Sequence, residues 1–288
     1  MRRLVAVLLG SALFALGCGD EDVAVGDPEP RAGSGPTQLH YGDDYAQQYG
    51  FLSVPPGDGP HPVIVFIHGG FWRNSFDTML ADPQAADAVA EGYATWNIEY
   101  RRVGDPDGGY PGTLVDVAAA VDHLATLAET EPLDLERVAV VGHSAGGHLA
   151  LWVGQRANLV SGAAGAAPEV VPRIVVGQAP VADLQANIDL GLGAVLGLMG
   201  APPADAPEAY AIADPAALLP IVVPQLVVQG AEDTIVPSDR VLAYEAKVAD
   251  PAQLTVEIFD GADHFDVIDP AHESWTLTLE RISAALTN

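Results

Sequence analysis

Ser144 lies in a sequence pattern that is typical of a nucleophilic serine. The segment 142–146 reads Gly-His-Ser-Ala-Gly, a G-x-S-x-G pattern. The apolar run before it (138–142) is typical of a buried strand, and the residues from Ala145 onward are typical of a helix. A serine on such a sharp strand-to-helix turn exposes its hydroxyl over the sheet edge, and the flanking glycines remove side chains that would collide there. The pattern therefore predicts Ser144 as a nucleophile.

A nucleophilic serine needs a base, and the base needs an orienting acid. His264 follows a predicted strand at 254–259, and Asp233 follows one at 225–229. Sites in parallel sheets collect at such strand ends. The pattern G-x-x-D-x-x-V-P favours Asp233 as the acid, and His264 is the predicted base. Three other acids remain as alternatives: Glu232, Asp239 and Asp266.

A second glycine-rich segment, HGGFW at 68–72, follows the predicted strand 62–67. Its glycines let the backbone bend so that N–H groups can face a developing oxyanion, and one such donor contributes about 3–4 kcal/mol. We assign this role to the N–H groups of Gly70, Phe71 and Ala145, with Gly69 as an alternative donor. His68 precedes the turn, so we expect it to shape the loop. Trp72 either walls the pocket or is simply buried.

Strands and helices alternate along the rest of the chain. Besides those named, strands are predicted at 93–100 and 174–178, and helices at 113–127, 145–155, 239–248 and 272–286. The alternation indicates an α/β fold, a mostly parallel sheet with helices on both faces. Because no break in composition divides residues 38–288, we expect one catalytic domain there. The segment 184–220, rich in Gly, Ala and Pro, predicts a helical insertion that is either a lid or a surface connection.

The N-terminus has the features of an export signal. Arg2 and Arg3 precede an apolar run at 4–16, which is shorter than the about 20 residues a membrane span needs. The run ends in Ala-Leu-Gly and then Cys18, the only cysteine of the chain. This resembles a bacterial lipobox, which implies a signal peptide at 1–17 and lipid attachment at Cys18. The alternative is a plain signal peptide. Residues 18–37 are predicted to be a flexible tether.

Composition excludes several classes of protein. The 288 residues carry 12 basic and 39 acidic side chains, a net charge of −27. Nucleic-acid binders need clustered Lys and Arg, so a nucleic-acid partner is excluded. The motif H-E-x-x-H is absent and the histidine spacings match no zinc pattern, so neither a metal nor another cofactor is expected.

Taken together, these motifs resemble the α/β-hydrolase superfamily, from about Leu39 to the C-terminus. The segments NIEYRR (97–102), YPG (110–112) and DVAAA (116–120) resemble a narrower esterase/lipase-like group. That group contains bacterial feruloyl-esterase-like enzymes, hormone-sensitive-lipase-like esterases and kynurenine formamidases, whose HGGxW motif is matched by 68–72. For Arg101 and Arg102, structural salt bridges are favoured over contact with a substrate carboxylate.

The leading hypothesis is an exported serine hydrolase that cleaves small-molecule carboxylic esters through an acyl-enzyme, with Ser144, His264 and Asp233 as the triad. It would be held at the bacterial cell envelope only by the lipid on Cys18, or else be secreted or periplasmic. An arylformamidase would use the same triad, although export argues against it. The third hypothesis is a non-catalytic, tethered binding module on the same fold.

Overall fold

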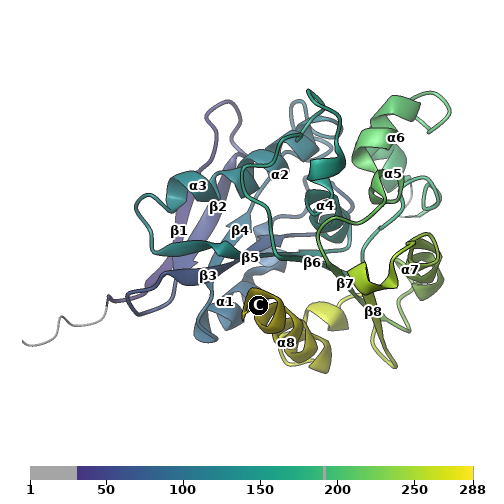
Figure 1. Ribbon diagram of the computed structural model, residues 1–288. Helices are drawn as coiled ribbons and strands as arrows, with labels where there is room; N and C mark the ends of the chain where they lie inside the picture. The colour runs from purple at the N-terminus through teal and green to yellow at the C-terminus, as the bar shows by residue number, and fades with distance from the viewer. Residues whose placement is uncertain (1–30, 191–192, 288) are drawn as a thin grey trace, which may run out of the picture. The chain divides into compact units, whose positions relative to one another are not determined.

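A central sheet organises the part of the chain that the computed structural model describes, residues 31–190 and 193–287. Within those residues the sheet has eight strands in the order β1-β2-β4-β3-β5-β6-β7-β8 (Figure 1). The strands are β1 (Ser34–His40), β2 (Tyr49–Val54), β3 (His61–Ile67), β4 (Ala94–Ile98), β5 (Leu133–His143), β6 (Ile174–Gln178), β7 (Gln225–Gly230) and β8 (Leu254–Phe259). Strands β6 and β8 have the predicted bounds, and β3, β4, β5 and β7 differ from them only at their ends.

Most of the sheet is parallel. Strand β2 pairs antiparallel with both β1 and β4, whereas every pairing from β4 through β3 to β8 is parallel. The carboxyl ends of β3, β5, β7 and β8 therefore meet at one edge of the sheet. These four ends precede the segments predicted to carry the site, so the topology brings those segments together.

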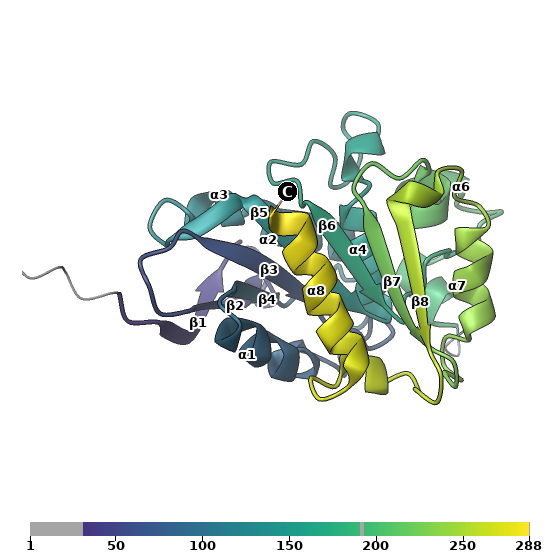
Figure 2. The ribbon, with the colours of Figure 1, turned by 60° about the horizontal axis from the view of Figure 1, so that its bottom comes forward.

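Alternation along the strands divides the core between two faces. In β3, Val63, Val65 and Ile67 belong to one apolar cluster and Ile64 and Phe66 to the other. Such runs, apolar on both faces, are typical of parallel strands covered on both sides. Helices α1 and α8 cover one face, as Figure 2 shows, and the remaining helices contribute to the cluster on the other. The predicted α/β fold, with helices on both faces, is confirmed.

The described residues form the helices α1 (Asp82–Ala90), α2 (Gly112–Asp122), α3 (Leu124–Leu127), α4 (Ala145–Val153), α5 (Ala194–Met199), α6 (Pro207–Ala213), α7 (Ser238–Glu245) and α8 (Glu273–Thr287). The helices predicted at 145–155, 239–248 and 272–286 correspond to α4, α7 and α8 and differ from them only at their ends. Short 3₁₀ turns lie at Thr78–Leu80, Arg156–Asn158, Pro215–Leu218, Pro251–Gln253 and Asp266–Ile268. The helix predicted at 113–127 is split at His123 into α2 and α3, and both Leu124 and Leu127 remain buried. Helix α1 was not predicted, although Pro83 in its first turn is a common helix start.

The N-terminal edge departs from the prediction. Strands β1 and β2 were not predicted, and the last four residues of the expected tether, 34–37, belong to β1. Strand β1 is almost entirely exposed, so hydrogen bonds to β2 define it and no burial pattern marks it in the sequence. The expected signal peptide, Cys18 and the rest of the tether lie outside the described residues.

The segment 184–220 contains α5 and α6, as the predicted helical insertion requires. Both helices bury apolar side chains in the same cluster as α4: Ala194, Val195, Leu198, Met199, Tyr210 and Ala213. In the part of the chain that is described, no helix is both long and apolar enough to cross a membrane.

Candidate active site

The serine lies on a strained turn between β5 and α4. Ser144 has φ 55° and ψ −115°, a backbone conformation that few non-glycine residues adopt. Its N–H donates to the carbonyl of Gln178 on β6 at 2.8 Å, which fixes the turn to the neighbouring strand. A Cβ at Gly142 would lie 2.0 Å from the carbonyl oxygen of Gly146, and one at Gly146 would lie 2.1 Å from that of Ile67. Both glycines are therefore required by the close approach of backbone.

The predicted acid and base are joined. Nδ1 of His264 donates to Oδ2 of Asp233 at 2.6 Å, and both side chains are almost fully buried. Asp233 follows β7 and His264 follows β8, two paired strands, so the pairing of the strands places the two loops side by side. Fixing Nδ1 as a donor leaves Nε2 of His264 as the nitrogen that can accept a proton.

Several donors hold Asp233 in its charged form. Its Oδ1 accepts from the N–H groups of Ile235 and Val236, both at 2.8 Å, and its Oδ2 accepts from Nε2 of Gln229 at 3.0 Å. Burial alone would raise the pKa of this carboxyl group, but the hydrogen bond and charge of His264, together with the two amides, lower it overall. A carboxylate that stays ionised can orient and stabilise the imidazolium of His264.

A second histidine, His143, contacts the loop that carries His264. His143, directly before Ser144, donates from Nε2 to the carbonyl of His264 at 2.9 Å, and the two rings lie 4.6 Å apart. Burial, and then the neighbouring His264, lower the pKa of His143 to about 3, so its ring is neutral near pH 7. Among the described residues no hydrogen bond joins the Ser144 hydroxyl to His264. The bond from His143 to the His264 carbonyl thus links the backbone of the His264 loop to the residue directly before Ser144.

The glycine-rich loop after β3 lies against the serine turn. Gly70, Phe71 and Trp72 have φ values of 112°, 56° and 54°, an unusual run of three positive angles. A Cβ at Gly69 would lie 2.8 Å from the carbonyl oxygen of His143 and 3.2 Å from Cβ of Ser144, so glycine is needed for this approach. Among the described loop and turn hydrogen bonds, none uses the N–H of Gly69, Gly70, Phe71 or Ala145 as its donor. These four N–H groups therefore remain candidates for binding an oxyanion.

His68 is placed as the loop-shaping residue that the sequence predicted. Its Nδ1 contacts the carbonyl of Gly69 at 2.8 Å and its Nε2 contacts Oε1 of Glu99 at 2.9 Å. Its ring stacks on that of Tyr100 with centroids 4.5 Å apart, and the Tyr100 hydroxyl donates to the carbonyl of His68. Because both ring nitrogens face acceptors, His68 has none left to act as a base.

A small apolar cavity opens beside Ser144. Its volume is about 10 Å³. Residues of four segments line it: the glycine-rich loop after β3 (the oxyanion loop), the serine turn, the loop after β7 that carries Asp233 (the acid loop), and the insertion. Trp72 lines it and is also fully buried, so both roles expected for this residue hold. From the insertion come Leu190, Ala194 and Val195. The insertion thus forms part of the site, and the simple surface connection considered from the sequence is excluded.

Among the described residues, the His264 ring forms its ion pair with Asp233, and none of the alternative acids forms one with it. Glu232 and Asp239 are exposed, and Oδ2 of Asp266 accepts the N–H of Asp263 at 2.7 Å. Among the described residues, His, Cys, Asp and Glu side chains form no group of three that could hold a metal ion.

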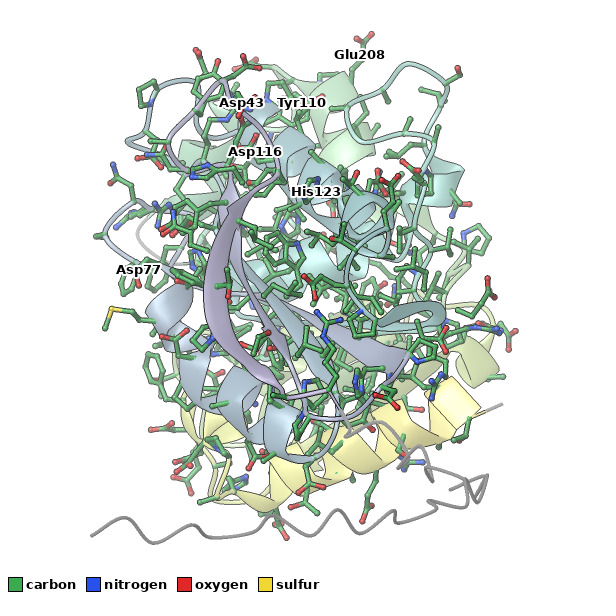
Figure 3. All side chains as sticks on the ribbon, turned by 90° about the vertical axis from the view of Figure 1, so that its left-hand side faces the viewer. Asp43, Asp77, Tyr110, Asp116, His123 and Glu208 are labelled. Atoms are coloured by element: carbon green, nitrogen blue, oxygen red, sulfur yellow. The ribbon has the colours of Figure 1, made fainter. Side chains whose placement is uncertain are left out.

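The paired arginines serve structure. Arg101 makes a two-point ion pair with Asp116 on α2, labelled in Figure 3, with N–O distances of 2.7 Å. Arg102 pairs with Glu99 at 3.1 Å. Both arginines are buried, as the favoured structural interpretation requires.

Two side chains that hold the candidate site were not predicted from the sequence. They are His143, which contacts the His264 backbone, and Gln229, which donates to Asp233. His143 stands at the variable position of G-x-S-x-G, next to the serine. A polar ring at that position only weakly indicates that the residue contacts the site. Gln229 ends a predicted strand and carried no signal.

Comparison with known proteins places the chain in a family of hydrolases. The family model BD-FAE matches residues 52–248. A kynurenine formamidase of Meyerozyma guilliermondii is 33% identical over 40% of this chain and 41% of its own length. Esterase LipC of Mycobacterium tuberculosis is 31% identical over 41% of this chain and 29% of its own length. The match therefore spans less than half of either relative.

Solved structures share the fold. A truncated carbohydrate esterase from gut microbiota superposes with a TM-score of 0.75 at 18% identity, over 90% of this chain and 98% of that one. Esterase B of Lactobacillus rhamnosis gives 0.73 at 20% identity, over 90% of this chain and 87% of that one. The arrangement of strands is that of the α/β-hydrolase fold. The family match covers the serine turn, the glycine-rich loop and the acid loop, and the chain belongs to the BD-FAE family.

Proposed function

We propose that this protein hydrolyses carboxylic esters, with Ser144 as nucleophile, His264 as general base and Asp233 as the orienting acid. The observation that carries the proposal is the buried 2.6 Å bond from His264 to an ionised Asp233, held beside a serine on a strained turn. Such an arrangement costs stability, through burial of charge and through backbone strain, and a catalytic role accounts for that cost.

The steps follow from the positions of these groups. The Ser144 oxygen attacks the acyl carbon while Nε2 of His264 takes the hydroxyl proton. The carbonyl oxygen becomes an oxyanion, which the N–H groups of Gly70, Phe71 and Ala145 stabilise. As the C–O bond of the ester breaks, His264 returns the proton to the leaving alcohol. Water, activated by the same imidazole, then cleaves the acyl-enzyme and restores the serine.

The relatives support an ester substrate. Esterase LipC and Esterase B carry that activity in their names, and the family match at 52–248 includes two of the three proposed triad residues, Ser144 and Asp233. An arylformamidase is the second candidate, since a kynurenine formamidase is among the relatives and the same triad would cleave a formamide. Export, proposed from the N-terminal sequence, favours the ester. A non-catalytic binding module would have no need for the intact Asp233–His264 pair.

The proposal is tested by the turnover of p-nitrophenyl acetate and of N-formylkynurenine. We expect ester hydrolysis that Ser144→Ala abolishes and Ser161→Ala, at an exposed serine of the same chain, leaves intact. Formamide turnover exceeding ester turnover would reverse the ranking of the two candidates. A wild-type rate equal to that of Ser144→Ala on both substrates would favour the binding module.

A covalent probe gives an independent test. An aryl phosphonate ester should transfer its phosphonyl group to the Ser144 oxygen as the aryl–oxygen bond to phosphorus breaks. His264 takes the serine proton and returns it to the departing phenoxide, which leaves as the phenol. We expect one added phosphonyl mass on the peptide that carries Ser144. Absence of labelling in the wild type, or equal labelling in Ser144→Ala, would contradict a serine mechanism.

A further inference from the structure

We propose that a cavity between helix α1 and strands β1, β2 and β4 binds a small primary amine with an apolar aliphatic or aromatic body. The ammonium group would contact Asn97 and Asp82, and the body would pack on Phe51 and Val89. This cavity shares no lining residue with the one beside Ser144. The inference therefore goes beyond the proposed ester hydrolysis and does not depend on it.

Strands β2 and β4 contribute four side chains to the floor of the cavity. They form two cross-strand pairs, Phe51 with Asn97 and Ser53 with Thr95. The neighbouring Leu52 belongs to the apolar cluster on the opposite face of the sheet. Because side chains alternate along a strand, the four floor residues point to the face that α1 and α8 cover.

Small side chains on α1 leave room above this floor. Ala85, Ala86 and Val89 of this helix line the cavity, and β1 contributes residues 34–36. The cavity measures about 430 Å³, within the range of about 300 to 1,000 Å³ that is typical of pockets for small molecules. Ala86 and residues 34–36 are exposed, so the cavity is open to solvent and its volume sets no limit on the length of the ligand.

Asn97 provides an acceptor that the protein leaves without a partner. Its Nδ2 donates to the carbonyl of Thr78 at 3.1 Å and to Oδ1 of Asp82 at 2.9 Å. Since both partners are acceptors, these bonds fix which atom of the amide is the oxygen. Asn97 is only 2% exposed, and its Oδ1 has no hydrogen-bond partner among the described residues. Buried acceptors are nearly always paired, so this oxygen indicates a donor that the protein itself does not supply.

Asp82 adds a negative charge beside this acceptor. Its Oδ1 is bound by Asn97, and no hydrogen bond between described residues uses its Oδ2. Partial burial raises the pKa of Asp82, the bond from Asn97 opposes this rise, and the charge of Asp77 adds to it. A cation beside Asp82 would favour its charged form. No basic side chain lines the cavity to provide that charge.

These groups together favour an amine over other ligands. An ammonium group carries three donors, enough for Oδ1 of Asn97, Oδ2 of Asp82 and one floor hydroxyl, whereas an alcohol carries one donor. An anion would meet Asp82 without any basic partner. The net charge of −27 also favours the approach of cations. Phe51, Ala85 and Val89 provide the apolar surface that the body of the ligand would cover.

Calorimetric titration of the intact protein compares phenethylamine with 2-phenylethanol, which has the same body and no charge. We expect phenethylamine to bind at one site and at least about tenfold more tightly, because hydrogen bonds between charged groups are stronger than neutral ones. Asp82→Asn keeps the shape of the side chain and should lower the affinity for the amine about tenfold, with that for the alcohol unchanged. Ser144→Ala should bind the amine as the wild type does.

A matched pair of variants locates the binding. Ala86→Trp places a large side chain at an exposed position that lines the cavity, and it should abolish amine binding. Ala90→Trp makes the same change at an exposed position of α1 outside the cavity, and it should bind as the wild type does. Thermal transitions verify that both variants are folded, and if Ala86→Trp is not, Asp82→Asn decides.

Three results would overturn the inference. Equal affinities for phenethylamine and 2-phenylethanol would exclude recognition of the amine. Equal amine binding by Ala86→Trp and the wild type would assign the binding to the acidic surface in general. Absence of binding for both phenethylamine and hexylamine would exclude the site. None of these results bears on Ser144, and failure of ester hydrolysis would leave the amine site standing.

Discussion

At the scale of single residues, two histidines flank Ser144 and neither is the base. His143 bonds to the backbone of His264, and His148, one turn along α4, donates from Nε2 to the carbonyl of Ala213 at 2.9 Å. Both are buried. Burial lowers the pKa of His148 to about 4. Each is therefore a neutral hydrogen-bond donor that ties α4 or its turn to a distant part of the chain, the loop of His264 for His143 and the end of α6 for His148.

His143→Ala should lower kcat about tenfold or more while changing KM little. The variant removes the donor to the His264 carbonyl, and small displacements of a catalytic group are costly because the reaction depends on its alignment. Steady-state kinetics on p-nitrophenyl acetate measures the change. His143→Gln, which keeps a side-chain donor, should recover most of the rate. If His143→Ala lowers thermal stability but leaves kcat unchanged, His143 has a structural role only.

His148 should make the protein sensitive to acid. In the unfolded chain a histidine binds a proton below its ordinary pKa of about 6.5, whereas the folded protein resists protonation down to about 4. The unfolded state thus holds one more proton between these values, and stability falls as the pH falls, by about 1.4 kcal/mol per pH unit. His148→Gln should remove this part of the slope. Denaturant unfolding at several pH values would refute the account if wild type and variant show parallel slopes.

At the scale of elements, the oxyanion loop depends on backbone that its neighbours hold in strained angles. The carbonyl of Gly70 accepts from the N–H of Arg73 at 2.9 Å, and that of Trp72 accepts from the N–H of Val103 at 2.7 Å. These two bonds fix the carbonyls at both ends of the run of positive φ angles. The loop between β3 and α1 is therefore positioned by the segment that follows β4.

Gly70→Ala should disable this loop. A Cβ there would lie 2.3 Å from Cβ of Phe76, at a φ of 112°. The loop must shift, and loss of one oxyanion donor lowers kcat by about 100- to 1000-fold. Gly92→Ala provides the matched control, since Gly92 also has a positive φ (94°) but an added Cβ would meet nothing within 4 Å. Equal kcat values in the two variants would argue against an oxyanion role for this loop.

At the scale of the whole molecule, the parallel sheet assembles the site. The serine turn, the oxyanion loop and the two triad loops follow four different strands, and their carboxyl ends share one edge. The insertion lines the cavity beside Ser144 through Leu190, Ala194 and Val195. A site made from five separate segments needs the complete sheet, so stability and activity should be lost together on unfolding.

We also propose that the complete chain is anchored to the envelope by a lipid on Cys18. The Ala-Leu-Gly-Cys sequence after an apolar run is the basis for this proposal. In a bacterial host, the wild-type protein should be found in the membrane fraction and take up labelled fatty acid. Cys18→Ser should take up none and leave that fraction, with its esterase turnover intact. Fatty-acid labelling that persists in Cys18→Ser would contradict attachment at this residue.

The sequence by itself determined the fold class and named Ser144, Asp233 and His264 as candidates. These features are local: a buried parallel strand shows as an apolar run, and the site residues directly follow such strands. Glycine patterns located the serine turn and the glycine-rich loop. A close approach of two backbone segments requires glycine at that position, so the requirement is visible in the sequence.

Only the tertiary structure decided the contacts between distant segments. The bond from His143 to His264 spans 121 positions, and no periodicity encodes it. Strand β1 exists because β2 offers it hydrogen bonds, and its own residues are exposed. The cavity beside Ser144 exists because side chains from α5 and from the loop after β7 line it together. Which distant segments meet is a property of the assembled core, so this cavity could be known only from the folded protein.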